Sequence, residues 1–274
     1  MLFMKDVTRR SGSGRRGRLA AIGASALAVA ALAAGACTAA TTAHAATTHT
    51  VATANSRSLT GTYTPPKRDL SIGEKGKDVL ALQKRLSALK YYPGAVDGQF
   101  GGDTQAALWA FQQINRIPDT GTLTAATKKA LVHPHTYVSP SYKGKKATRI
   151  EVSQAKEILV YFKNNKIWFI SHVSSGGGYS YCSKNGCSFA HTPNGTYTTG
   201  VFLPGWVHVA LGEMYNPVFF ISTVYAIHGD TYVPKGPASH GCVRIPMDAA
   251  AFFHKMVQTP GTQVHVYGKP QYES

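Results

Sequence analysis

The spacing of the apolar residues changes once along this chain, near residue 148, and this change limits what the chain can fold into. Before it, apolar residues recur every three or four positions, the period of one face of an α-helix. After it, they alternate with polar residues or gather in short runs, as β-strands do. The sequence predicts a small helical part followed by a β-rich part, and a length of 274 residues suits two domains with tails.

The helical part, residues 70–132, is predicted to hold three helices. The first is indicated by apolar residues at helical spacing: Val79, Leu82, Leu86 and Leu89. The second covers residues 104–113 and the third residues 124–132. Pro93 and Gly94 lie between the first two and prevent one continuous helix. We therefore expect a small all-α module.

The β-rich part is expected at residues 148–268, after a linker at residues 133–147. A single helix is predicted at residues 248–257, with Pro246 just ahead of it. Asn164 and Asn165 between two strand-like runs indicate a hairpin. The predicted strands are residues 149–153, 158–162, 167–173, 196–199, 206–210, 218–221, 225–228 and 264–267.

The first 45 residues have a different composition from the rest. A basic head precedes an apolar run at residues 19–36, the order of a secretory signal peptide. A membrane anchor is the alternative, but the run is mostly Ala and Gly, which insert weakly. We expect cleavage after Ala45; lipidation of Cys37, in a loose likeness of a lipoprotein box, is the other possibility. Residues 46–69, rich in Thr, Ser and Ala, read as a flexible linker.

The chain is strongly basic, with a formal net charge of +16. The first 45 residues contribute +5 of it, which leaves +11 for the exported protein. A basic surface attracts any polyanion, and outside a cell the available polyanions are wall polymers and acidic lipid head groups. We therefore expect a location in the cell wall or outside the cell, anionic wall polymers as partners, no nucleic acid and a monomer.

Chemistry is concentrated around Cys242. A thiol becomes a useful nucleophile when an imidazole takes its proton or a positive potential lowers its pKa. His240 is two residues away, and His228 precedes Cys242 by fourteen. Gly241 lets backbone N–H groups approach a developing oxyanion, and Arg244 has a forked donor suited to a carboxylate. Zinc bound by the thiol and the two imidazoles is the rival interpretation. We expect neither a metal nor a cofactor.

The helical part resembles a known family. Leu82-Gln83, Tyr-Tyr-Pro-Gly-x-Val-Asp-Gly-x-Phe-Gly at residues 91–101, Thr104 and Phe111-Gln112 are similar to the peptidoglycan-binding module of wall hydrolases. The likeness departs at residues 119–122, where Asp-Thr-Gly-Thr replaces the Asp-Gly-x-Gly pattern. It implies binding to wall glycan; a spacer without glycan contact is the alternative.

The β-rich part resembles the L,D-transpeptidases. Ser-His-Gly-Cys-Val-Arg at residues 239–244, preceded by Ile-His-Gly at residues 227–229, is similar to their active-site signature. Thr-Pro-Asn-Gly at residues 192–195 and Met-Tyr-Asn-Pro at residues 214–217 add to the likeness. The resemblance implies a β-sandwich with the cysteine in a pocket on one side.

The resemblance also implies roles for the residues of the signature. Cys242 is the expected nucleophile and His228 the expected general base. The carbonyl of Gly229, where some relatives have Ser, is expected to orient the imidazole. Backbone N–H groups near Gly241 and Cys242 are expected to form the oxyanion hole.

The remaining signature residues are expected to meet the substrate. His240 and Ser239 are expected to shape the pocket, and Arg244 to hold the donor stem peptide, although other family members carry Asn there. The implied reaction forms 3-3 cross-links between peptidoglycan stem peptides through a thioester, and releases D-alanine. Resolution by water would instead make a carboxypeptidase. A cysteine peptidase and a non-catalytic wall-binding protein also remain open.

Three cysteines remain if Cys37 is removed with the signal peptide. In an exported protein, three cysteines are expected to form one disulfide and leave one unpaired thiol. Cys242 has a chemical reason to be the unpaired one. Cys182 and Cys187 flank an Asn-Gly pair that favours a tight reversal. We expect a disulfide between them, in a flap beside the catalytic pocket. A metal site using both sulfurs with His191 is the alternative.

Overall fold

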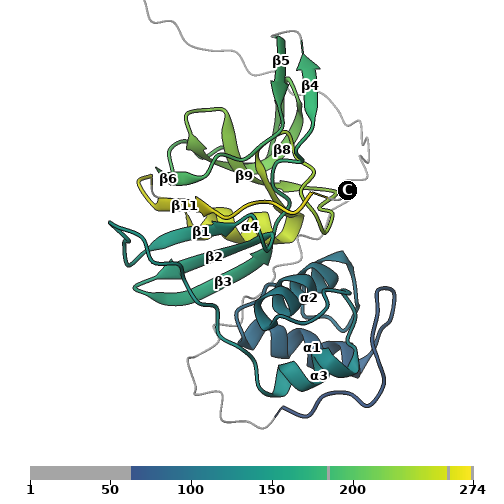
Figure 1. Cartoon of the computed structure of the whole chain (residues 1–274). Coiled ribbons are helices and arrows are strands. Elements are labelled where there is room, and N and C mark those ends of the chain that lie inside the picture. The colour runs from purple at the N-terminus through teal and green to yellow at the C-terminus, as the bar shows by residue number, and fades with distance from the viewer. Residues whose placement is uncertain (1–62, 184–185, 258–259, 273–274) are drawn as a thin grey trace, which may run out of the picture. The chain divides into compact units, whose positions relative to one another are not determined.

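A computed structural model describes residues 63–183, 186–257 and 260–272 of this chain (Figure 1). The predicted signal peptide, the processing alternatives at Ala45 and Cys37, and most of the predicted linker lie outside the described residues. All described residues belong to one compact unit. Within them, no helix combines the length and the apolar character needed to cross a bilayer.

The three predicted helices of the module are confirmed. They are α1 (Lys77–Ala88), α2 (Gly102–Asn115) and α3 (Ala125–Val132). The apolar residues that indicated α1 face a buried core shared with α2 and α3. Thr124 caps α3, since its side chain accepts a hydrogen bond from the N–H of Thr127.

Two buried glutamines hold the loops of the module in the same way. Gln83 accepts a hydrogen bond from the N–H of Gly98 at 2.8 Å and donates to the carbonyl of the next residue at 2.9 Å. Gln112 accepts from the N–H of Gly121 at 2.9 Å and donates to the following carbonyl at 2.9 Å. Gly121 has φ +69°, a conformation that favours glycine. The departure at residues 119–122 therefore keeps a loop of the same kind.

The β-rich part forms two main sheets, which confirms the predicted sandwich. A five-stranded sheet has the order β3-β2-β1-β11-β6 and a four-stranded sheet the order β10-β9-β8-β7, while β4 and β5 form a hairpin that projects from them (Figure 1). The helix α4 (Met247–Met256) packs in the core that both sheets share. The strands are β1 (Arg149–Ser153), β2 (Ile158–Lys163), β3 (Lys166–His172), β4 (Ser180–Ser183), β5 (Gly186–Phe189), β6 (Gly195–Thr198), β7 (Trp206–Val209), β8 (Gly212–Ile221), β9 (Tyr225–Asp230), β10 (Val243–Pro246) and β11 (Gln263–Tyr267).

A tight turn explains the pairing of β2 with β3, whereas the two parallel pairs depend on packing between distant segments. Asn164 and Asn165 have φ angles of 52° and 60°, the left-handed pair that a two-residue hairpin needs, and they join β2 to β3. The parallel pairs β1-β11 and β9-β10 join segments that are distant in the sequence. The sequence analysis did not predict β10, because four residues ending in Pro246 are too short to show a period.

The strand β2 is buried on both faces, which explains its unbroken apolar run. Leu159 and Tyr161 belong to the core of the sandwich. Ile158, Val160 and Phe162 instead join the core of the helical module. The two predicted domains thus share a hydrophobic core.

The module also covers the open edge of the five-stranded sheet. Ile170 on β3 forms a bridge with Tyr91, in which the N–H of Ile170 donates to the carbonyl of Lys90 at 2.8 Å. The predicted linker at residues 133–147 is likewise tied down, because the Tyr137 hydroxyl donates to Glu151 at 2.8 Å. An exposed sheet edge invites association with other chains, and the module removes this edge from solvent.

We expect the helical module and the sandwich to unfold in one cooperative transition, because they share a core. Ile170→Ala should lower the free energy of unfolding by about 2–5 kcal/mol and shift that single transition. Calorimetry of the folded chain tests this expectation. Two separate transitions, of which only one responds to Ile170→Ala, would show that the parts fold independently.

Candidate active site

The predicted site residues meet at the connection between β9 and β10. Parallel strands cannot be joined by a tight turn, so the chain travels from Asp230 back to the start of β10 through residues 231–242. The pairing of β9 with β10 sets Arg244 opposite His228. Cys242 therefore lies directly before β10, two residues ahead of Arg244, the partner of His228.

His228 is held as a neutral imidazole with a defined tautomer. Its side chain is buried, and its Nδ1 lies 2.9 Å from the carbonyl oxygen of Gly229. Because a carbonyl only accepts, Nδ1 must carry the proton, which leaves the lone pair on Nε2. Burial lowers the pKa of His228 below its ordinary value. The ring is thus prepared to accept a proton at Nε2.

Gly229 is required by packing as well as by this hydrogen bond. A Cβ at this position would lie 2.8 Å from the Cβ of Ala250 on α4 and 3.1 Å from the ring of Tyr215. The backbone that orients His228 therefore rests directly on α4. A serine here would require α4 to shift.

The Cys242 thiol is in a resting position. Its Sγ lies 3.7 Å from the carbonyl oxygen of Val224, and the side chain packs against Met214, Phe219 and Ala226. Burial raises the pKa of the thiol, although the Ala226 backbone and the charge of Arg244 oppose this rise. In the described part of the chain no hydrogen bond joins Cys242 to His228. The thiol must turn away from Val224 before the imidazole can deprotonate it.

The turn before Cys242 depends on Gly241. Its φ is +142°, and a Cβ would lie 2.6 Å from the Tyr225 ring and 2.8 Å from the carbonyl oxygen of His191. The Thr192 hydroxyl donates to the Gly241 carbonyl at 2.7 Å and accepts from the N–H of Gly176 at 2.9 Å. Thr192 belongs to the Thr-Pro-Asn-Gly motif, so this motif fixes the turn before Cys242.

Ser239 has a different place from the one expected. It is 1% exposed, and its hydroxyl donates to the carbonyl of Cys242 while accepting from the N–H of Gly241 at 2.9 Å. The hydroxyl therefore closes the turn and cannot reach a bound peptide. The Gly241 N–H is consequently occupied and is not aimed at a substrate. The Cys242 N–H has no acceptor among the described residues, so it is a free backbone donor of the turn.

Arg244 lies close to every other candidate. Burial lowers the pKa of His228 and His240, and the charge of Arg244 adds to this lowering. Burial raises the pKa of Cys242, and the same charge opposes this rise. Nε of Arg244 lies 3.1 Å from Oδ2 of Asp230, so one arm of the guanidinium is already paired. The other arm is available to a carboxylate.

His240 is covered by the β4-β5 hairpin. Its ring meets the edges of Tyr181 and Tyr179, with ring centroids 4.7 and 5.7 Å apart. In the structure Cys182 and Cys187 lie directly opposite each other in this hairpin and are joined by a disulfide. Their Cα atoms are 3.9 Å apart, closer than the usual range of about 4.4–6.8 Å. The cross-link lies beside the aromatic side chains that contact His240.

A buried carboxyl group that the sequence analysis missed supports the same turn. Glu157 is 6% exposed and accepts hydrogen bonds from the N–H and the hydroxyl of Ser175 at 2.7 and 2.6 Å. The Ser175 carbonyl in turn accepts from the N–H groups of Ala238 and Ser239, both at 2.9 Å. Nothing in the local sequence marks Glu157, because the contact joins distant segments.

The thiol of Cys242 and the imidazoles of His228 and His240 do not form a metal site in the described part of the chain. Among the residues that the structure describes, no three His, Cys, Asp or Glu side chains are grouped so that they could hold a metal ion.

Glu157 makes the stability depend on pH. Burial raises its pKa from 4.5 to about 8, so between these values the native state binds more protons than the unfolded chain. The free energy of unfolding should therefore fall as pH rises through this window. Asp103, with a pKa raised to about 6, acts in the same direction, and His172, lowered to about 4, acts in the opposite one.

We predict that Glu157→Gln flattens the pH dependence of the melting temperature. Asp103 and His172 titrate in both proteins, so the difference between the two curves isolates Glu157. Thermal melts from pH 5 to pH 9 measure it. Parallel curves would mean that Glu157 has the same pKa in the folded and unfolded states.

We predict that Gly229→Ala lowers both stability and activity. The added methyl group forces β9 away from α4, at a cost of about 1–3 kcal/mol, and this displaces His228. Ala250→Gly removes the atom at 2.8 Å, so the double variant should recover part of both losses. Additive losses would show that the two positions do not interact.

Two family models match the chain. A putative peptidoglycan binding domain matches residues 75–131, and the L,D-transpeptidase (YkuD) catalytic domain matches residues 147–266. Spore cortex-lytic enzymes are 43% identical over 65 residues (Bacillus cereus) and 37% identical over 78 residues (Oceanobacillus iheyensis). These matches cover 24% and 28% of this chain and 25% and 28% of the relatives, so the chain spans about a quarter of their length.

A solved structure extends the likeness to both parts of the fold. The crystal structure of an L,D-transpeptidase from Xylanimonas cellulosilytica is 32% identical, with a TM-score of 0.66. The match covers 74% of this chain and 100% of that one. With its sandwich, its module and its cysteine signature, the chain belongs to the L,D-transpeptidase family.

Proposed function

We propose that this protein forms 3-3 cross-links in peptidoglycan, with Cys242 as nucleophile and His228 as general base. The observation that carries the proposal is the hydrogen bond from Nδ1 of His228 to the Gly229 carbonyl. It leaves Nε2 unprotonated. His228 lies on β9, and β9 pairs with β10, the strand that follows Cys242. No metal or organic cofactor is needed, because a thiolate both attacks a carbonyl carbon and leaves it readily.

In the first acyl transfer, Nε2 of His228 takes the thiol proton. Sγ then attacks the carbonyl carbon of the third residue of a tetrapeptide stem. The Cys242 N–H donates to the oxyanion, which is the largest electrostatic contribution expected in such a site. The C–N bond breaks, and the imidazolium gives its proton to the departing amine of D-alanine. A thioester remains on Cys242.

In the second transfer, the side-chain amine of the third residue of another stem attacks the thioester. The C–S bond breaks as a new amide bond forms, and the proton lost by the amine returns to the thiolate. Attack by water would release a tripeptide instead. Because the pKa of Cys242 is raised, its sulfur leaves the thioester more easily when it receives a proton. We assign the delivery of this proton to His228.

Each remaining site residue has a proposed role. The free arm of Arg244 binds a carboxylate of the donor stem, while Asp230 fixes its orientation. His240 forms one wall of the pocket together with Tyr181. Ser239 and Gly241 position the nucleophile through the hydrogen bonds of the turn.

The proposed place of action is the cell wall outside the membrane, where stem peptides, glycan and anionic polymers occur. We do not assign a lytic activity. The matches to spore cortex-lytic enzymes cover too little of this chain to include the sandwich.

We predict that Cys242→Ser abolishes turnover and that His228→Ala lowers it by about 10²- to 10⁴-fold. Serine in this site stays protonated, and alanine removes the proton acceptor. Incubation with a tetrapeptide stem, followed by intact mass measurement, should reveal an acyl adduct on Cys242 in the wild-type protein alone.

Product analysis separates the alternatives. A cross-linked dimer supports the transpeptidase, whereas a free tripeptide would identify a carboxypeptidase. Cleavage of an ordinary L-peptide in place of the stem would indicate a peptidase. Absence of any adduct, in a protein that still binds walls, would leave a non-catalytic binding protein.

A further inference from the structure

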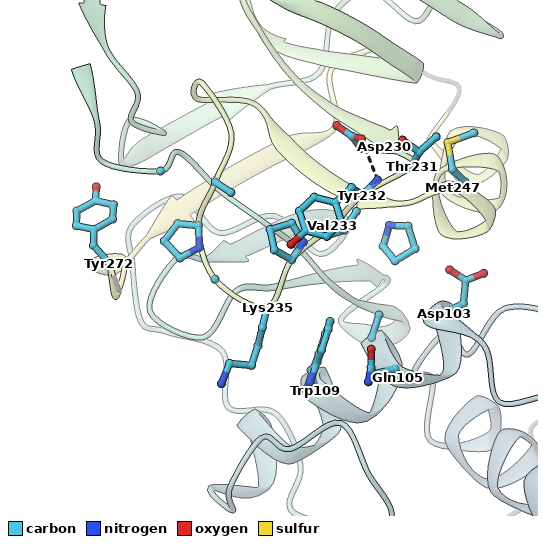
Figure 2. A pocket seen from close by; sticks show the side chains of 18 residues that line it. Asp103, Gln105, Trp109, Asp230, Thr231, Tyr232, Val233, Lys235, Met247 and Tyr272 are labelled. Carbon is cyan, nitrogen blue, oxygen red and sulfur yellow. Dashed lines mark hydrogen bonds between the residues drawn. The ribbon is translucent and has the colours of Figure 1, made fainter. Parts of the chain in front are cut away.

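A groove separates α2 of the helical module from the connection between β9 and β10 (Figure 2). It encloses about 840 Å³. The side chains of Asp103, Gln105 and Trp109 project into it from α2, and those of Tyr232 and Lys235 come from the connection (Figure 2). The two parts of the chain thus contribute opposite walls of one groove.

The groove offers aromatic surfaces to a ligand. Tyr232 is 69% exposed and Tyr272 is 43% exposed, although both line the groove. The ring of Trp109 is fixed by an edge contact with His172, at 5.1 Å between centroids, and by close approach to Gly121. Exposed aromatic faces with a rigid mounting bind flat apolar surfaces at low entropic cost.

The groove also holds hydrogen-bonding groups that the fold does not use. In the described part of the chain, no side-chain hydrogen bond is made by the Gln105 amide, the Tyr232 hydroxyl or the Tyr272 hydroxyl. The same holds for the indole N–H of Trp109. Together these groups can both donate and accept.

The charge of the groove excludes a polyanion as its ligand. Lys235 is the only cationic side chain among the described residues that line it, and its Nζ already lies 3.6 Å from a carboxylate oxygen of Asp119. Asp103 and Asp230 add negative charge. A neutral polymer with apolar faces and many hydroxyl and amide groups suits this lining better, and a polysaccharide of N-acetylated sugars has that chemistry.

The groove borders the proposed catalytic turn. Asp230, at one end of it, pairs with Arg244, and Ala238, at its wall, precedes Ser239. A polymer in the groove would therefore lie along the segment that leads to Cys242.

We propose that this groove binds the glycan strand that carries the stem peptides, so that the glycan site is shared between the helical module and the sandwich. This inference rests on the proposed function, since it assigns the groove to the same substrate. The module supplies one wall of this site and the connection between β9 and β10 supplies the other. Bound glycan holds the stem peptides close to the turn that ends in Cys242.

The test measures binding of soluble chitin oligosaccharides, which are neutral chains of N-acetylated sugars and stand in for the glycan strand without its stem peptides. Tyr232→Ala changes the wall formed by the connection, and Gln105→Ala changes the wall formed by α2. Each should weaken binding about tenfold, the effect of losing about 1.4 kcal/mol. Trp168→Ala is the matched control, because Trp168 is 51% exposed on β3 and lies outside the groove. Equal melting temperatures verify that each variant is folded.

Weakening by both groove variants, with an unchanged control, supports the shared site. Weakening by Gln105→Ala alone would place the glycan on the module and overturn the inference, as would an effect of Tyr232→Ala alone. Equal binding by all variants would also overturn it. The acyl adduct on Cys242 is measured separately with a free tetrapeptide, so a failed glycan site and a failed catalytic assignment give different results.

Discussion

Because β9 and β10 run parallel, the chain must return along the sheet between them, and the candidate site is built on that return. The strand β9 holds His228 and Gly229 in a ladder, and β10 fixes Arg244 opposite His228. The connection between them is free of regular structure, so it can present an irregular turn before Cys242. A two-residue hairpin connection between antiparallel strands would be too short to contain this irregular segment. The parallel pairing therefore places Arg244 opposite His228 and leaves Cys242 in the turn just before β10.

An irregular turn needs its backbone groups satisfied, and buried polar side chains provide this. Thr192 holds the carbonyl of Gly241, Ser239 bridges the turn internally, and Glu157 acts through Ser175. These partners come from segments far apart in the sequence. A buried polar group without a partner costs about 1–3 kcal/mol, so each one that is satisfied selects a single arrangement of the turn. This explains how a segment without helix or strand can hold Cys242 in a defined place.

The sequence predicted what depends on local pattern. The three helices of the module, most strands and the hairpin at Asn164-Asn165 follow from spacing and turn chemistry. The cysteine signature predicts the candidate site, because Gly241 and His228 stand at short distances from Cys242 in the sequence. The shared core was not predictable, since the apolar run of β2 does not reveal that Ile158 faces the module while Leu159 faces the sandwich. Nor were Glu157, Asp230 and the inward position of Ser239, which depend on contacts between distant segments.

The resting position of the thiol has a physical consequence for its reactivity. Burial keeps Cys242 protonated, and its contact with the Val224 carbonyl keeps it apart from the base. Oxidants and electrophiles react with the thiolate and much less with the thiol, so this arrangement limits damage in an oxidising environment. The same chain carries an oxidised pair, Cys182 and Cys187, a few residues from Tyr179, which contacts His240. Among the described cysteines, one pair of sulfurs is thus committed to structure, while Cys242 has a free thiol.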